Sequence, residues 1–459
     1  MNLKIPKKSR LRTFLGTDSA DFLAYAMDAV ERILPHLEIA KWEINNSFQK
    51  SGVTWVGTKR RQLKISLGIS DTDGRAKGFT VTGTVQRRKI LAGVGKVERT
   101  LDLRERNVCE KILTRLNELL PSSRSHDTQT ILSFHSSFDE QVVAAHLKDY
   151  QHLELNLTDL FSALRNLAEQ SYENKALTFG CLIDCRDKSK AQRDAAFPHD
   201  FLKLKKFRLF SDGYRTAYKL SANGCVKGFC ALTEPRKKPP GSSYFPEWSR
   251  DLATHCVASA IGISLTRQGD ILIIESGTLR FTYRLGKWQY WNHTHLVDLL
   301  QNAARAQRVP PSKIPKVART MYRSALDVSF RRSGGLFVLL RNNKNLRQLV
   351  HPGDAIRDIQ RRDIETYFDN ALPSKNIQTL SRSIITELTS VDGAIVLNNK
   401  GEILAYGAVL EPKKKGRISR EEGSRTKAAI GASNYGLAIK ISSDGDITVY
   451  AKGKKLMKI

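Results

Sequence analysis

The sequence lacks any long uninterrupted apolar run, which is the feature that a membrane-spanning helix requires. No stretch of its 459 residues approaches the roughly 20 apolar residues that cross a bilayer. The basic segment from Met1 to Thr13 is not followed by an apolar stretch, so it does not have the form of a secretory signal. We therefore expect a cytoplasmic protein with no membrane partner.

Cysteine is scarce, with six residues in the chain. The spacing within the pairs Cys181/Cys185 and Cys225/Cys230 differs from that of the closely spaced cysteine ligands in structural zinc sites. Both pairs lie in apolar, strand-like surroundings. Reduced cysteine commonly packs as a small hydrophobic residue. The cysteines are therefore expected to be buried free thiols, which agrees with a reducing compartment.

Acidic residues are also in short supply, because 75 Lys and Arg outnumber 46 Asp and Glu and leave a formal net charge of +29. Such a charge attracts polyanions, including nucleic acids and nucleoside triphosphates, and it also favours solubility. A dedicated nucleic-acid surface therefore stays open as one interpretation.

Two sequence patterns resemble functional sites but are better explained as structural features. The segment from Ala92 to Lys96 resembles a phosphate-binding P-loop, but Ile90 and Val97 stand where that motif needs a glycine and a hydroxyl residue. The aromatic run from Trp288 to Trp291 has strand spacing, and such residues are more often part of a hydrophobic core.

Helical and strand-like segments are mixed along the whole chain, which predicts a multidomain α+β protein. Helical periodicity from Leu101 to Leu120 ends at Pro121, and a polar linker follows. The stretch from Trp248 to Ile263 also has helical periodicity, which predicts one helix. The expected domains are an N-terminal α+β module at 1–125, a second α+β module with a β-hairpin at 126–310, and a C-terminal α/β domain at 311–459.

The last third has the pattern of an α/β domain, with a central mixed sheet flanked by helices. An amphipathic helix at 316–330 precedes short apolar runs at 334–340 and 391–397, which are typical of strands covered on both faces. A basic loop at 413–420 leads to a glycine turn that opens another helix, and two strands complete the domain.

The segment that starts at Gly423 has the chemistry to bind phosphates. A glycine at the start of a helix presents free backbone N–H groups to anionic oxygens. Ser424, Arg425, Thr426 and Lys427 add hydroxyls and cations at the same place. Asp392 is suited to binding a divalent metal or deprotonating a ribose hydroxyl. Each motif taken alone favours a plainer interpretation, an aspartate in a turn before a strand and a capped basic helix.

The order of these elements resembles the catalytic domain of the diadenylate cyclases. That family carries an Asp-Gly-Ala motif, matched by Asp392 to Ala394, and a Gly-Thr-Arg-His-Arg-Ala-Ala motif, matched by Gly423 to Ala429. The resemblance implies an enzyme that condenses two ATP molecules into cyclic di-AMP and pyrophosphate. It also implies self-association, because two ATP-loaded domains would meet face to face.

The resemblance also implies a role for individual residues. Asp392 and Arg425 are expected to be catalytic, and Asp392 with Asp444 is expected to bind Mg²⁺ or Mn²⁺. The expected nucleotide-binding residues are Gly393, Ala394, Leu410, Gly423, Ser424, Arg425, Thr426 and Lys427.

Three positions depart from the family pattern. Thr426 stands in place of a histidine, Lys427 in place of an arginine, and Ser443 in place of a glutamate, which leaves Asp444 one residue late. Two alternatives therefore remain open, a catalytically inactive nucleotide sensor of the same fold and a basic nucleic-acid-binding protein. Residues 270–291 resemble accessory modules found upstream of some family members, so we hypothesise that residues 1–310 sense a ligand and regulate the C-terminal domain.

Overall fold

A computed structural model describes the chain in two compact units, residues 1–243 with 251–291 and residues 244–250 with 292–459. The described residues are 28–30, 32–35, 39–45, 61–69, 76–85, 88–97, 102–119, 135–188, 197, 205–233, 243–256, 259–356, 372, 375–413 and 423–459. Most of the predicted basic loop at 413–420 lies outside them. Within these residues no helix combines the length and the apolar character needed to span a bilayer.

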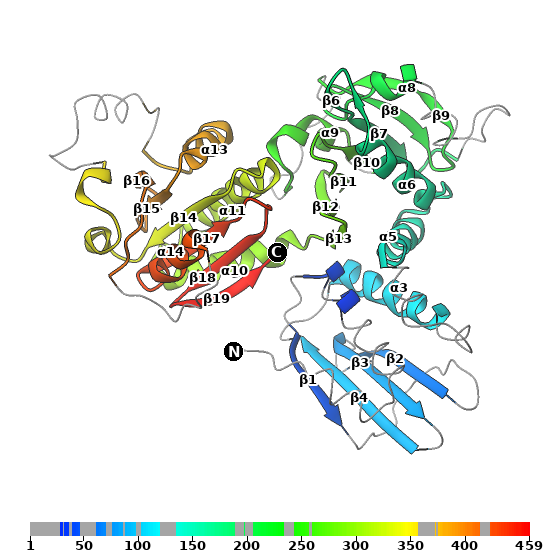
Figure 1. The fold of residues 1–459 in the computed structure, drawn as a ribbon, viewed down its shortest axis with the longest axis horizontal. Helices are drawn as coiled ribbons and strands as arrows, with labels where there is room; N and C mark the ends of the chain where they lie inside the picture. The colour runs from blue at the N-terminus through cyan, green and yellow to red at the C-terminus, as the bar shows by residue number, and fades with distance from the viewer. Residues whose placement is uncertain are drawn as a thin grey trace. The chain divides into compact units, whose positions relative to one another are not determined.

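The first unit begins with a four-stranded antiparallel sheet in the order β1-β4-β3-β2, drawn in blue in Figure 1. Its strands are β1 (Ile39–Asn45), β2 (Arg61–Ile69), β3 (Ala76–Val85) and β4 (Arg88–Val97). Helix α3 (Leu103–Leu119) contacts β2, and α5 (His135–Gln151) packs against α3. The rejected P-loop segment therefore lies within β4.

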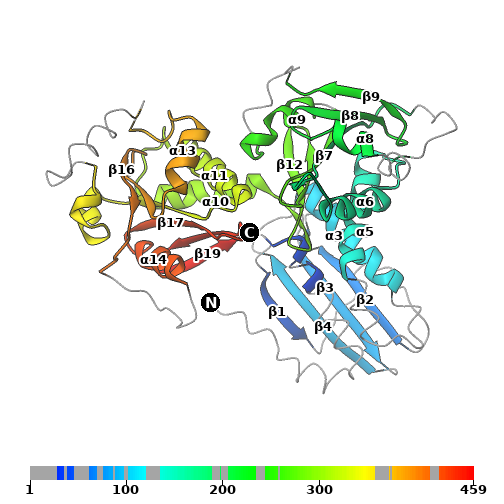
Figure 2. The same ribbon diagram turned by 45° about the horizontal axis from the view of Figure 1, so that its top comes forward.

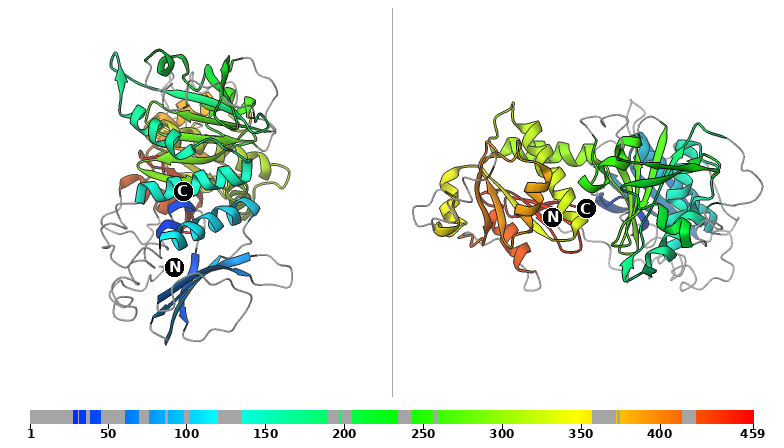
Figure 3. Two further views of the ribbon diagram at one scale, coloured as in Figure 1. Left: turned by 90° about the vertical axis from the view of Figure 1, so that its right-hand side faces the viewer. Right: turned by 90° about the horizontal axis from the view of Figure 1, so that it is seen from above.

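A seven-stranded mixed sheet in the order β13-β12-β11-β10-β7-β8-β9 forms the rest of the first unit. Its strands are β7 (Phe179–Asp184), β8 (Thr216–Ser221), β9 (Val226–Ala231), β10 (Ala260–Leu265), β11 (Ile271–Glu275), β12 (Thr278–Arg284) and β13 (Lys287–Tyr290). Helices α5 and α6 (Leu157–Ala168) share one buried core with it (Figure 3). Shorter elements are β5 (Ser171–Tyr172), β6 (Lys175–Ala176), α8 (Lys205–Phe210) and α9 (Arg250–His255).

In this unit the predicted hairpin and aromatic core are present, whereas one predicted helix is not. The hairpin between β11 and β12 is confirmed, and Ser276 and Gly277 both have positive φ angles, as a type I′ turn requires. Trp288 and Tyr290 lie in the core, as their spacing predicted. The prediction of one helix from Trp248 to Ile263 is wrong, because this stretch contains the short helix α9 and then β10.

All six cysteines are free thiols, as predicted. Cys109, Cys181 and Cys256 are buried, whereas the other three are half-buried. Burial raises the pKa of Cys181 to about 12, which favours the uncharged thiol.

The second unit is built on a six-stranded mixed sheet in the order β16-β15-β14-β17-β18-β19. Its strands are β14 (Gly335–Leu340), β15 (Ala394–Leu397), β16 (Ile403–Ala408), β17 (Gly436–Ile441), β18 (Ile447–Ala451) and β19 (Lys454–Lys458). Only β14 and β15 pair in parallel, and the other neighbours are antiparallel. Together with the sheets of the first unit, this arrangement confirms the α+β class.

Helices cover both faces of this sheet (Figure 2). Leu336 and Val338 of β14 face α14 (Ser424–Ala432), with which they form one core cluster. The other face packs against α11 (Ile314–Arg331) and α13 (Arg382–Ser390). Because both faces are covered, β14 is buried along its whole length, which explains its uninterrupted apolar sequence.

Helix α10 (His293–Ala306) belongs to the second unit, because it packs against α11. The expected domain boundary at 310/311 therefore falls inside this unit, which also includes residues 244–250. The expected division of the preceding residues at 125/126 stays a prediction.

Candidate nucleotide-binding site

The predicted site residues gather at one edge of the six-stranded sheet. β14 and β15 begin at this edge, because they are parallel and pair in register, and the antiparallel β17 ends there. Asp392 and Gly393 come directly before β15, and the turn at 442–446 links β17 to β18. Helix α14 lies against β17 and ends near the start of that strand, so its first turn points to the same edge.

Asp392 and Arg425 meet at this edge in an ion pair. Nη2 of Arg425 lies 3.7 Å from Oδ1 of Asp392, although the two residues are 33 positions apart in the sequence. The Asp392 side chain is fully exposed at 102%, and that of Arg425 is 37% exposed. An exposed ion pair contributes little to stability, because water screens both charges. Asp392 or Arg425 can therefore leave this ion pair and bind a ligand with little loss of free energy.

Gly334 leaves the space in which the Arg425 guanidinium lies. A Cβ atom at position 334 would stand 2.4 Å from Nη1 of Arg425, which is closer than real contacts allow. Gly334 also has a φ of +70°, which favours glycine. The glycine directly before β14 thus leaves room for Arg425 to extend in this direction.

The first turn of α14 forms an electropositive cluster. Gly423 is the N-cap, makes no side-chain cap, and is followed by a turn with no acidic residue. Backbone N–H groups at a helix N-terminus carry partial positive charge and have no partners within the helix. Ser424 is exposed, whereas Arg425, Thr426 and Lys427 are half-buried. This turn therefore presents donors and cations together.

Lys440 joins this cluster from the neighbouring strand. Its Nζ donates a hydrogen bond to Oγ1 of Thr426 at 3.0 Å. Lys440 has no signal in the sequence, because the local pattern of β17 does not indicate which element its side chain reaches.

Gly393 is required by the packing of the sheet. Its φ is +127°, and a Cβ atom there would stand 2.3 Å from the carbonyl carbon of Gly407. The resemblance gave Gly393 a role in nucleotide binding, whereas the structure shows that the β16 backbone already demands a glycine. Gly393 is half-buried, and its role in nucleotide binding stays a prediction.

Two other expected binding residues are less available to a ligand. Ala394 as a whole residue is 1% exposed and belongs to the core cluster beneath α14. Leu410 packs partly against the same cluster, and its backbone bridges to Val350. Leu410 is half-buried and can meet a ligand through the exposed part of its side chain, whereas Ala394 is buried as a whole residue and offers almost no accessible surface.

Asp444, the second expected metal ligand, is exposed in the turn at 442–446, at the same edge of the sheet. Among the described residues, no group of three or more His, Cys, Asp or Glu side chains is placed to hold a metal ion. Mg²⁺ is commonly bound through one or two carboxylates and completed by substrate phosphates and water. The exposed carboxylate of Asp392 suits that mode of binding.

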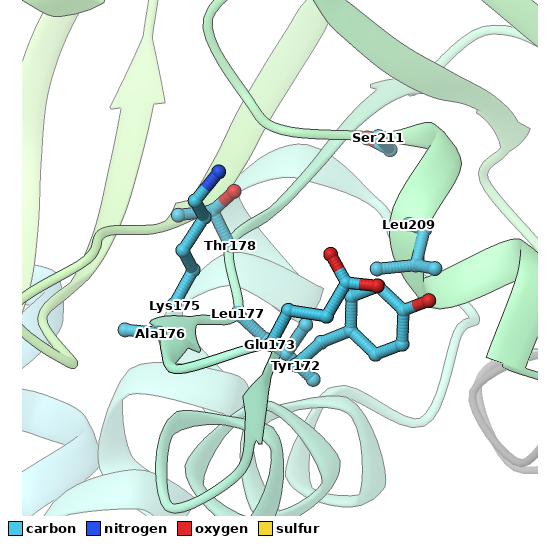
Figure 4. A pocket seen from close by; sticks show the side chains of 8 residues that line it. All are labelled: Tyr172, Glu173, Lys175, Ala176, Leu177, Thr178, Leu209 and Ser211. Carbon is cyan, nitrogen blue, oxygen red and sulfur yellow. The ribbon is translucent and has the colours of Figure 1, made fainter.

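The first unit contains a separate surface hollow of about 300 Å³ near the β5–β6 hairpin. Figure 4 shows Tyr172, Glu173 and Leu209 on one side of it and Lys175 and Thr178 on the other. None of the residues expected to bind nucleotide lines this hollow.

An α/β domain with cations gathered at a helix N-terminus has the features of an anion-binding domain. Residues 323–455 match the model of the family described as "DisA bacterial checkpoint controller nucleotide-binding". The C-terminal third of the chain is therefore a nucleotide-binding domain of the diadenylate cyclase family. This finding confirms the resemblance for that part of the chain.

The solved structures that are similar to this chain include the following two. One is described as a hypothetical membrane spanning protein from Bacillus cereus, which is 21% identical, with 36% of this chain and 75% of that chain covered and a TM-score of 0.25. The other is a double mutant of DacA from Staphylococcus aureus, which is 20% identical, with 31% and 87% covered and a TM-score of 0.21. A search of curated proteins gave no match.

Proposed function

We propose that this protein is a metal-dependent diadenylate cyclase that condenses two ATP molecules into cyclic di-AMP and releases two pyrophosphates. The observation that carries the proposal is the meeting of Asp392 with Arg425 beside the first turn of α14, within a domain of this family. Phosphoryl transfer depends mostly on positioning and charge, and this edge of the sheet supplies both.

In the proposed reaction, each 3′-hydroxyl oxygen attacks the α-phosphorus of the other ATP molecule, and pyrophosphate leaves. Asp392 accepts the hydroxyl proton, directly or through water, and helps to hold Mg²⁺ or Mn²⁺. The metal would neutralise charge on the phosphates, and Asp444 is the proposed second carboxylate for it. Arg425 and the donors of Ser424 and Thr426 stabilise the negative charge that develops on the phosphate oxygens.

The proposal requires two domains, because one ATP molecule must attack another that is bound elsewhere. The full exposure of Asp392 leaves its carboxylate accessible to a nucleotide held by a second copy of the domain. We therefore propose that self-association of the C-terminal domain completes the site.

The test is to incubate the purified protein with ATP and Mg²⁺ or Mn²⁺ and to identify the product by mass spectrometry. Cyclic di-AMP supports the proposal. A protein that binds ATP but forms no product would instead be a nucleotide sensor of the same fold.

The net charge of +29 favours a second candidate, a nucleic-acid-binding protein. That function predicts tight binding to DNA or RNA that weakens steeply with salt and survives removal of residues 311–459. Regulation of the cyclase by residues 1–310 remains a proposal, and a ligand that binds them and changes the rate of synthesis would support it.

A further inference from the structure

We propose that Lys440 is a phosphate-binding residue of this site and that it acts as a pair with Thr426. The pair supplies the positive charge that a threonine at position 426 lacks on its own. This inference rests on the proposed use of ATP, and it adds a residue that neither the sequence motifs nor the family match assigns.

The sheet determines where the Lys440 side chain points. Ala438, two residues earlier in β17, belongs to the core cluster beneath α14, and side chains two apart in a strand lie on the same face. Lys440 therefore extends from the face that α14 covers. Its side chain is half-buried, and its ammonium group reaches Oγ1 of Thr426 in the first turn of that helix.

The resulting charge distribution favours an anion. Arg425, Lys427 and Lys440 all stand at the positive end of the α14 dipole, where cations are destabilising. The first turn offers no acidic residue, and the Asp392 partner of Arg425 is fully exposed and 3.7 Å away. A ligand with several negative charges, such as a triphosphate, would offset the repulsion among these cations.

The hydrogen bond also sets the roles of the two side chains. Thr426 accepts a hydrogen bond from Lys440, so its own O–H hydrogen is directed elsewhere. The hydroxyl can thus donate to a phosphate oxygen while the ammonium contributes positive charge beside it. Lysine acts as a point charge without the fork geometry of arginine, so accurate placement by Thr426 matters.

If Lys440 binds phosphate, its effect on ligand affinity should depend on the negative charge of the ligand. Lys440 would strengthen binding of ATP and have little effect on binding of adenosine, which has no phosphate. A lysine that only supported the packing of α14 would affect both ligands alike.

The experiment compares the full-length protein with Lys440→Met, Lys440→Arg and Thr426→Val, using calorimetric binding of ATP and of adenosine. Lys440→Met should weaken ATP binding about tenfold or more, because a hydrogen bond to a charged group is lost. Adenosine binding should change by less than about twofold. Lys440→Arg should recover most of the ATP affinity, and Thr426→Val should lose part of it.

Lys454→Met is the matched control, because Lys454 is an exposed lysine at the opposite edge of the same sheet. It should leave both affinities unchanged. Equal ATP binding by wild type and Lys440→Met would overturn the inference, as would a parallel loss of ATP and adenosine binding. If wild type makes no cyclic di-AMP yet Lys440→Met still selectively loses ATP, the proposed function fails and the inference stands.

Discussion

Arg382 donates two hydrogen bonds to the buried carboxylate of Asp327, from Nε at 2.8 Å and from Nη2 at 2.6 Å. The backbone N–H of Glu247 donates a third, at 2.7 Å. This group ties the start of α13 to α11 and to the segment at 244–250. Because α13 ends two residues before Asp392, the pair anchors the helix that leads into the candidate site.

Removal of Arg382 should destabilise the second unit. Burial raises the pKa of Asp327, and the charge of Arg382 counteracts this shift, so Arg382→Met would leave a buried carboxylate without its cation. Loss of one partner of a buried ion pair typically costs about 3–5 kcal/mol. Thermal unfolding of the second unit should show a correspondingly lower midpoint.

The matched control is Arg331→Met. Arg331 also joins α11 to α13, through Glu387 at 2.7 Å, but these side chains are 45% and 67% exposed. An exposed pair contributes at most about 1 kcal/mol, so this variant should unfold almost like wild type. Equal destabilisation by the two substitutions would contradict the assignment of Arg382 as the anchor.

Asp392→Asn should abolish synthesis of cyclic di-AMP. The amide keeps the size of the side chain but has no negative charge for a metal ion and is a far weaker base. Product formation would be measured by mass spectrometry, and ATP binding by calorimetry. Binding should persist in the variant, and a variant that still turned over at the wild-type rate would exclude Asp392 from the reaction.

Gly334→Ala should lower activity by displacing Arg425. The new methyl group would occupy the position of the Arg425 guanidinium, and the positive φ at 334 adds about 1 kcal/mol of backbone strain. We expect the rate of cyclic di-AMP synthesis to fall clearly, while the midpoint of thermal unfolding falls only modestly. The loss of activity would then exceed what unfolding of the protein explains.

The corresponding control is Gly286→Ala, at another glycine with a positive φ, which has no atoms close to its Cβ position. It should show a similar backbone strain with unchanged activity. If both alanine variants had the same activity, Gly334 would have only a conformational role.

The first unit should lose stability as the pH falls below about 6.5, owing to His146. Burial, together with the nearby charges of Arg104 and Lys111, lowers the pKa of His146 to about 3. The unfolded chain therefore binds a proton below about pH 6.5 that the folded chain does not bind. Between about pH 7 and pH 5 this linkage removes about 2 kcal/mol of stability.

Urea denaturation at pH 7 and pH 5 would measure this loss. Unfolding would be monitored by tryptophan fluorescence, to which Trp288 in the core of the first unit contributes. His146→Gln removes the titrating group, so the difference between the two pH values should become smaller. An unchanged difference in the variant would assign the pH dependence to other residues.

The sequence by itself determined most of the elements and motifs of the C-terminal domain. Uninterrupted apolar runs predicted β14 and β15 because these strands are covered on both faces, and the glycine at 423 predicted the start of α14. These features depend on neighbours along the chain, so their signals are local.

Only the tertiary structure decided which of these features meet. Lys440 reaches Thr426, Gly334 makes room for Arg425, and Arg382 binds Asp327 across 55 positions. The prediction of a helix at 248–263 failed because it used only local spacing. Residues from 260 onward are buried in a central strand of the seven-stranded sheet, and these contacts with neighbouring strands outweigh their helical spacing. Contacts between residues distant in sequence leave no local pattern, since they depend on how the strands are ordered and which face each helix covers.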